Sequence, residues 1–155
     1  AAKRRMLIFS QFVGMLQMIR KRLGREGIQT LYLDGETRPD KRQELCDRFN
    51  GGEGRVFLIS LKAGGTGLNL TGADLVIHYD PWWNPAAEDQ ATDRAHRIGQ
   101  AHDVDVVKLI AQGTIEEKVT DLSKRKRAVF DRVVMAGETE LRSLSEEDIR
   151  ALFFS

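Results

Sequence analysis

Apolar runs of strand length alternate along the chain with segments whose apolar residues recur at helical spacing. Residues 6–10 form a continuous apolar run, and the apolar side chains from there to residue 23 recur every three or four positions. The same alternation predicts further strands at 30–34, 55–60, 74–79 and 104–110. Strands that alternate with helices are typical of a parallel sheet with crossover helices, so we expect an α/β fold.

Proline and capping residues predict where the later helices begin. Pro39 can open a helix that runs to residue 49, because proline needs no backbone donor in a first helical turn. Asn84 can cap a helix to about residue 98 that has Pro85 in its first turn. Thr114, with Glu117 three residues later, has the spacing of a capping box and predicts the start of a long amphipathic helix.

These elements divide the chain into three parts. We assign residues 1–112 to the α/β unit and residues 113–136 to the long amphipathic helix, packed on that unit. Residues 137–155 are expected to form a short linker and a last helix. The predicted architecture is therefore a parallel sheet flanked by helices, with a helical extension at the C-terminal end.

The composition fits a folded domain whose charges balance. Of 155 residues, 41% are hydrophobic and 30% charged, and 24 Lys and Arg against 23 Asp and Glu leave a net charge of +1. Any contact with nucleic acid must therefore be local. The chain has a single cysteine, Cys46, which excludes an internal disulfide and indicates a reducing compartment. We expect Cys46 to lie in the core of the domain. No apolar run approaches the roughly 20 residues of a membrane span, so a cytoplasmic or nuclear location is expected, without membrane partners.

Three glycines within four positions follow the strand predicted at 55–60. Gly64, Gly65 and Gly67 would let the backbone approach a ligand closely and adopt positive φ, and exposed N–H groups there can cradle phosphate. The spacing is not the dinucleotide fingerprint, because Leu70 stands where a third glycine would be. A tight turn without a ligand fits the same residues, so this segment alone leaves both interpretations open.

Two arginines recur with a glutamine on the helix predicted after Pro85. Gln90, Arg94 and Arg97 lie at i, i+4 and i+7 and so share one face of a regular helix. Two guanidiniums side by side can neutralise charge that develops on a transferred phosphoryl group. A solvated helix face with local salt bridges is the alternative. No set of His, Cys or carboxylates with metal-ligand spacing accompanies the arginines, so we predict no metal site.

Two adjacent tryptophans occupy the turn after the strand at 74–79. Trp82 and Trp83 would be costly to leave exposed, so each is expected either to pack on the core or to touch a partner. Open parallel sheets place their ligand-binding loops at this edge.

Five segments share their order and intervals with the motifs of one known family: residues 7–12, 33–35, 62–70, 83–85 and 90–100. They resemble helicase motifs IV, IVa, V and VI of the Swi/Snf remodelling ATPases, and the Asp-Arg-Ala-His-Arg-Ile-Gly-Gln string at 93–100 is the most specific of them. The resemblance covers nearly the whole chain. It implies a RecA-like C-terminal motor lobe of bacterial or archaeal type, with residues 113–136 as the family's brace helix.

The resemblance also implies roles for individual residues. Arg94 and Arg97 match the paired arginine fingers, which should be largely exposed in an isolated lobe, and Gln90 matches a glutamine at the nucleotide cleft. The other matched positions are contact residues: Gly65, Gly67 and Asn69 for the nucleotide, and Lys62, Gly64 and Trp83 for DNA.

The function implied is that of an ATP-dependent double-stranded-DNA translocase that remodels protein–DNA complexes. The sequence has neither a Gly-x-x-x-x-Gly-Lys-Ser/Thr loop nor an Asp-Glu-x-His motif, which belong to the N-terminal lobe of such motors. The expected partners are therefore that lobe of the same parent chain, duplex DNA and a DNA-bound protein complex. ATP with Mg²⁺ is the expected cofactor, with the metal ligands on the other lobe, and this chain alone is expected to be an inactive, excised domain.

Two alternatives remain beside the translocase. A strand-separating helicase lobe is disfavoured because residues 94–97 read Arg-Ala-His-Arg instead of the Arg-x-Gly-Arg of DEAD-box-type chains. A binding module without catalysis is disfavoured because both arginines and the glycine loop are retained. The sequence upstream in the parent chain would decide between catalysis and binding alone.

Overall fold

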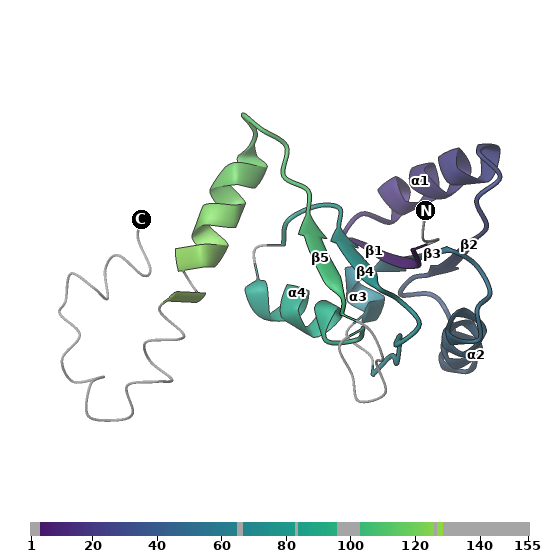
Figure 1. Ribbon diagram of the computed structural model, residues 1–155. Helices are drawn as coiled ribbons and strands as arrows, with labels where there is room; N and C mark the ends of the chain where they lie inside the picture. Colours follow the sequence, from purple (N-terminus) through teal and green to yellow (C-terminus); the bar gives the residue numbers. More distant parts are fainter. Residues whose placement is uncertain (1–3, 65–66, 83, 96–102, 126, 129–155) are drawn as a thin grey trace, which may run out of the picture.

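A five-stranded parallel sheet forms the centre of the structure (Figure 1). The computed structural model describes residues 4–64, 67–82, 84–95, 103–125 and 127–128. The strands lie in the order β2-β3-β1-β4-β5, and their bounds are β1 Met6–Ser10, β2 Thr30–Leu33, β3 Val56–Ser60, β4 Leu75–His78 and β5 Asp105–Lys108. The predicted α/β fold with a parallel sheet is confirmed.

Helices cover both faces of the sheet (Figure 1). Their bounds are α1 Val13–Arg25, α2 Pro39–Asn50, α3 Leu61–Gly64 and α4 Pro85–Thr92. Successive residues of β1 point to opposite sides: Phe9 lies in the larger core cluster with residues of α2 and α4, and Ile8 in the smaller cluster with residues of α1. Burial on both faces explains why β1 and β3 read as continuous apolar runs.

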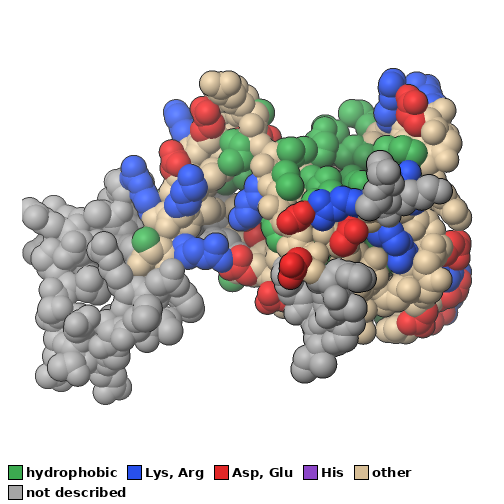
Figure 2. Space-filling view, viewed as in Figure 1, with side chains coloured by type: hydrophobic (Ala, Val, Ile, Leu, Met, Phe, Trp, Pro, Cys, Tyr) green, Lys and Arg blue, Asp and Glu red, His purple; other side chains and the backbone are tan. Residues whose placement is uncertain are grey.

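The described part of the sheet is less completely covered beside α1 than on the opposite face. Helix α1 packs against β1, β2 and β3. Strand β5 lies at the edge of the sheet, and Val106 and Val107 on it are exposed. Figure 2 shows hydrophobic side chains gathered between α1 and the helix at residues 115–125. No helix within the described residues is long and apolar enough to cross a membrane.

The C-terminal end of α4 differs from the prediction. Asn84 caps this helix as expected, since its side-chain oxygen accepts a hydrogen bond from Ala86 N at 3.2 Å. The helix ends at Thr92, six residues before the predicted end at residue 98. Arg94 N and Ala95 N bond to carbonyls three residues back instead of four, which tightens the last turn. Residues 96–98 of the predicted helix lie outside the described residues.

The helix after Gly113 begins where its capping residues predict. Residues 115–125 are helical, and Thr114 Oγ1 accepts a hydrogen bond from Glu116 N at 3.2 Å. The Glu117 carboxylate accepts from Gly113 N at 3.1 Å, one residue earlier than in a regular capping box. The predicted extension of this helix to residue 136 and the last segment at 137–155 lie outside the described residues, apart from 127–128, so these boundaries stay predictions.

Candidate nucleotide and DNA interface

The segments that resemble motifs IV, IVa and V meet at the carboxyl ends of the strands. Ser10 ends β1, Asp34 follows β2, and Lys62 follows β3 on α3. Asp34 and Lys62 border a cavity of about 430 Å³ whose lining residues are Gln11, Val13, Gln17, Asp34, Gly35, Glu36, Ser60 and Lys62. The structure therefore brings the exposed Lys62 together with residues nearly thirty or more positions away in the sequence.

Asp80 joins the turns that follow β1 and β4. Its buried carboxylate accepts hydrogen bonds from Ser10 Oγ and, at 3.0 Å, from Gln11 N. Gln11 Nε2 donates in turn to Pro81 O at 3.3 Å. The position of the Trp82 turn is therefore set by the end of β1. Asp80 was not among the predicted site residues, although a carboxylate directly after a predicted buried strand is a signal for such a linkage.

Asp34 carries a negative charge into the same cavity. Burial raises the pKa of this carboxyl, but hydrogen bonds from Tyr32 Oη, Thr37 Oγ1 and two backbone N–H groups outweigh burial and hold the pKa below its usual value. The carboxylate is thus ionised at neutral pH. Because Glu36 also lines this cavity, Lys62 stands beside acidic side chains and not in a purely basic groove.

The glycine loop bonds directly to the segment that resembles motif VI. Gly67 is exposed and has φ of +54°, which confirms the predicted positive φ. Asn69 is exposed, and Leu70 N donates to Arg94 O at 3.0 Å. Gly64 ends α3, so a short helix stands where a turn was predicted. Gly65, another predicted nucleotide contact, lies outside the described residues.

The prediction that Arg94 is largely exposed in this lobe is wrong. The residue is 6% exposed, because the tight turn at residues 93–95 brings the chain back against the glycine loop and buries Ala95 completely. Gln90, four residues earlier on α4, is exposed. The two side chains therefore do not share the exposed face that a regular helix would give them. Arg97 lies outside the described residues.

Gln90 borders an open hollow on the outer side of α4. The hollow has a volume of about 440 Å³ and is lined by Asn84, Ala86, Ala87, Asp89, Gln90 and Asp93. Two carboxylates and two carboxamides on a single helix and its caps make this surface polar. In the described residues, no group of three or more His, Cys, Asp or Glu is placed to hold a metal ion.

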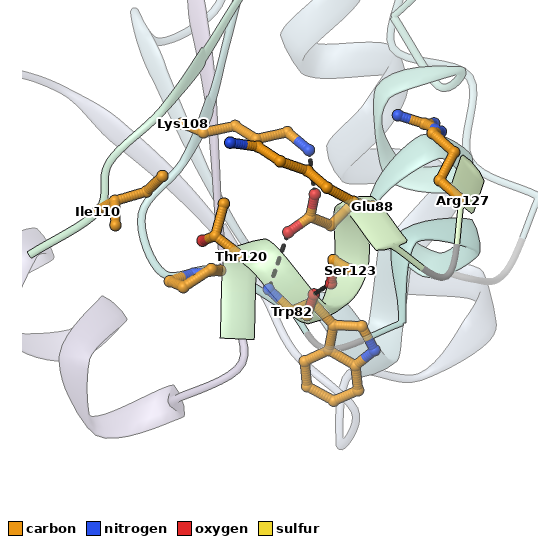
Figure 3. Close-up of a pocket in the computed structure, with 9 residues that line it drawn as sticks. Trp82, Glu88, Lys108, Ile110, Thr120, Ser123 and Arg127 are labelled. Atoms are coloured by element: carbon orange, nitrogen blue, oxygen red, sulfur yellow. Dashed lines mark hydrogen bonds and ion pairs between the residues drawn. The ribbon is translucent and has the colours of Figure 1, made fainter. Parts of the chain in front are cut away.

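Trp82 packs against the core, as predicted for at least one of the two tryptophans. Its backbone N–H donates to the buried Glu88 carboxylate at 2.8 Å, and Lys108 of β5 forms an ion pair with the other carboxylate oxygen (Figure 3). Glu88 thus links the Trp82 turn, α4 and β5. Trp83, the predicted DNA contact, lies outside the described residues.

The helix at 115–125 is attached to the lobe next to Trp82. Ser123 Oγ donates to Trp82 O at 2.9 Å, and the Arg127 guanidinium pairs with Asp89 of α4. Between these contacts lies a cavity of about 240 Å³ whose wall includes Ile110 and Thr120 (Figure 3). The contacts support the prediction that this helix packs on the α/β unit.

His78 of β4 is hydrogen-bonded to the C-terminal end of α4. Its ring is buried, stacks on Phe9 at 5.8 Å and shares a hydrogen bond of 3.0 Å with Thr92 Oγ1. Burial lowers the pKa of the imidazole, so the ring is neutral at physiological pH. Thr92 is two residues before Arg94, so this bond fixes the start of the Arg94 turn. His78 was not among the predicted site residues, because a histidine in an apolar strand gives no sign of its partner.

Comparison with known protein families matches residues 1–99 to the helicase conserved C-terminal domain. Among curated proteins, an uncharacterized ATP-dependent helicase of Mycoplasma pneumoniae is 40% identical over 152 residues, covering 97% of this chain and 15% of that protein. Helicase swr1 of Aspergillus fumigatus is 42% identical over 151 residues, covering 97% of this chain and 9% of that protein. The chain thus spans a small fraction of these relatives.

A solved structure shares both fold and sequence with this chain. The crystal structure of the C-terminal part of the Fun30 ATPase domain superposes with a TM-score of 0.75 at 40% identity. The match covers 78% of this chain and 39% of that one.

Proposed function

This chain belongs to the helicase conserved C-terminal domain family, in its Swi/Snf branch, and we propose that it is the C-terminal lobe of a double-stranded-DNA translocase. Its relatives are named as ATP-dependent helicases, which supports ATP use by the parent protein. The observation that carries the proposal is the backbone bond from Leu70 N to Arg94 O. It joins the 62–70 loop, which carries proposed contacts to both DNA and the nucleotide, to the segment that carries Arg94.

On the nucleotide side, Arg94 and Arg97 are proposed to stabilise charge on the γ-phosphate of an ATP held by the N-terminal lobe. A guanidinium lowers the barrier to phosphoryl transfer when it is positioned against the developing charge. Since Arg94 is buried in this lobe, its proposed role requires the turn at 93–95 to open when the two lobes close. Hydrolysis would then depend on lobe closure.

The nucleotide cleft is proposed to include Gln90 together with Gly65, Gly67 and Asn69. Support comes from the exposure of Gln90, Gly67 and Asn69, which leaves the side chains of Gln90 and Asn69 and the backbone of Gly67 accessible to a ligand. ATP would bind together with Mg²⁺, which carboxylates of the N-terminal lobe would hold. The metal ion would neutralise charge around the phosphates.

On the DNA side, Lys62, Gly64 and Trp83 are proposed to contact the phosphate backbone of duplex DNA. Support comes from the exposed position of Lys62 at the carboxyl edge of the sheet. The net charge of +1 and the acidic neighbours Asp34 and Glu36 make a broad electrostatic attraction weak, so the contact is local and without base specificity. The parent protein would move along the duplex through such contacts and thereby remodel a DNA-bound protein complex.

The arginine role is tested by Arg94→Ala and Arg97→Ala in the full-length parent protein. Arginine fingers contribute about 10³ to 10⁵ in turnover in phosphoryl-transfer enzymes, so DNA-stimulated ATPase should fall by a factor in that range. Nucleotide and duplex binding, measured by titration, should change far less because most of those contacts come from other residues. Near-normal turnover in either variant would exclude that arginine as a finger.

The DNA contact is tested by Lys62→Ala in the same protein, with Lys21→Ala as the control. Each phosphate contact releases counterions, so loss of Lys62 should lower the slope of log affinity against log salt by about one unit. Lys21 is exposed in the second half of α1, away from the cavity, and its loss should leave the slope unchanged. Equal slopes for both variants would remove Lys62 from the DNA site.

A strand-separating helicase is the alternative, and relatives that are named helicases keep it in view. A triplex-displacement assay run beside a strand-displacement assay on the full-length protein separates the two. A translocase should displace the third strand and leave the duplex intact.

A further inference from the structure

One side chain at the end of α2 holds both ends of the segment from Asn69 to Gly72, here called the 69–72 segment. Asn50 Nδ2 donates to Asn69 O at 2.9 Å, and Asn50 Oδ1 accepts from Gly72 N at 2.9 Å. A single carboxamide thereby satisfies one acceptor and one donor three residues apart. These bonds set the distance of the 69–72 segment from α2.

Close packing at Gly72 reinforces the attachment. A β-carbon at this position would lie 3.0 Å from Asn50 Cα and 2.9 Å from Arg5 Nη1. Arg5 Nη1 also donates to Gly72 O at 3.3 Å, and the Arg5 guanidinium lies 4.1 Å over the ring of Phe49 in α2. The end of α2, Arg5 and the 69–72 segment therefore form one packed unit.

A second residue of α2 meets the same segment. Cys46 is completely buried, and the backbone N–H of Asn69 faces its sulfur. Both backbone groups of Asn69 are thus engaged by α2, the N–H by Cys46 and the carbonyl by Asn50.

The opposite side of the 69–72 segment reaches Arg94. Leu70, the residue next to Asn69, donates its N–H to Arg94 O at 3.0 Å, and its side chain is completely buried. A continuous path of hydrogen bonds therefore runs from Asn50 through Asn69 and Leu70 to the Arg94 turn.

We propose that Asn50 is a positioning residue of the motor: by holding the 69–72 segment it fixes the end of the 62–70 loop, which carries the proposed DNA contacts, relative to Arg94. The proposal rests on the proposed function. Asn50 is half-buried at the end of a helix. Within the described residues, its carboxamide forms hydrogen bonds only to backbone atoms of the 69–72 segment. Its effect is therefore expected on the DNA response more than on the core.

The test uses the full-length parent protein with Asn50→Ala and Asn50→Asp. Misplacement of a reacting group by about 1 Å can cost roughly a hundredfold in rate, so we expect kcat of DNA-stimulated ATPase to fall about tenfold to a hundredfold in Asn50→Ala. The DNA concentration for half-maximal stimulation should rise as well. Asn50→Asp conserves size but places an oxygen against Asn69 O, so it should be impaired at least as much as the alanine variant.

Gln43→Ala is the matched control. Gln43 has an exposed carboxamide on the same helix, and it donates a hydrogen bond to Asp47 at 2.8 Å instead of bonding to the 69–72 segment. This variant should keep the unmodified kcat and half-maximal DNA concentration. Thermal unfolding of all three variants measures the folded fraction under assay conditions.

Each result then has one meaning. Unchanged kcat and half-maximal DNA concentration in folded Asn50→Ala would overturn the proposal. A fall in kcat that only follows the folded fraction, with the half-maximal DNA concentration unchanged, would also overturn it, because a purely structural role produces that result. If the unmodified parent shows no DNA-stimulated ATPase, the proposed function itself fails, and this inference fails with it.

Discussion

At the scale of single residues, Gly72 is required by the atoms around it and not by its backbone angle. Its neighbours leave no room for a methyl group, since Asn50 Cα would be 3.0 Å from an added β-carbon. Gly72→Ala should therefore destabilise the chain by about 1–3 kcal/mol, the usual cost of overpacking. The free energy of unfolding in urea measures this change.

Gly24→Ala supplies the control for that substitution. Gly24 lies in α1, and an added β-carbon there meets no atom within 4 Å. Because alanine favours the helix, this variant should be neutral or more stable by roughly 0.5 kcal/mol. Equal losses of stability in the two variants would contradict the packing argument at Gly72.

Residue properties that depend on local sequence were predicted correctly, and those that depend on distant contacts were not. Gly67 has the predicted positive φ, which follows from residue type and position after a strand. The burial of Arg94 depends on Leu70, which is twenty-four positions away, and on a turn that abandons the regular helical spacing. No helical spacing in the sequence encodes that contact.

At the scale of elements, the ion pair between Glu88 and Lys108 fastens α4 to β5. The Glu88 side chain is 5% exposed and the Lys108 side chain 41%. Lys108→Met would leave a buried carboxylate with the N–H of Trp82 but without its cation, so we expect a loss of about 1–3 kcal/mol in the free energy of unfolding. Adding Glu88→Gln to that variant should recover part of the loss, because the buried charge is then removed.

Lys41→Met is the control for this element-scale test. Lys41 pairs with Glu44 on α2, where both side chains are about half exposed. Exposed pairs contribute roughly 0–1 kcal/mol, so thermal unfolding should hardly shift. If Lys108→Met and Lys41→Met were equally mild, burial of Glu88 would not matter to the attachment of α4.

The positions of elements were more predictable than their ends. Every strand lies within a predicted apolar run, because a run of that kind is a local property of the chain. Helix ends depend on competing hydrogen bonds. Helix α4 ends at Thr92 because the next N–H groups, those of Arg94 and Ala95, bond to carbonyls three residues back instead of four. Helix α3 was expected as a turn, because the glycines that follow Ala63 in the sequence favour turns and a helix of four residues leaves no periodic signal.

At the scale of the whole molecule, we expect the isolated chain to have no measurable ATPase activity, with or without duplex DNA. The sequence contains neither the phosphate-binding lysine loop nor the Asp-Glu-x-His motif that positions Mg²⁺. Phosphate release by the chain and by the full-length parent at equal concentration measures this difference. DNA-stimulated turnover by the chain alone would contradict its assignment as one half of a motor.

The parallel sheet followed from the alternation of elements, but the strand order β2-β3-β1-β4-β5 did not. Periodicity says which face of a strand is buried and nothing about which strand lies beside it. The order matters for the site because it places β1 between β3 and β4, so that motif segments distant in sequence end at one edge.

The position of Cys46 makes the chain sensitive to alkylating reagents only when it opens. Burial raises the pKa of this thiol to about 11, so at pH 7 only about one molecule in ten thousand carries the reactive thiolate. Cys46 is the single cysteine of this chain and lies against Asn69, so separation of the 69–72 segment from α2 would open a path to it. The rate of alkylation of this chain therefore reports, without any engineered label, how often the 69–72 segment and α2 separate.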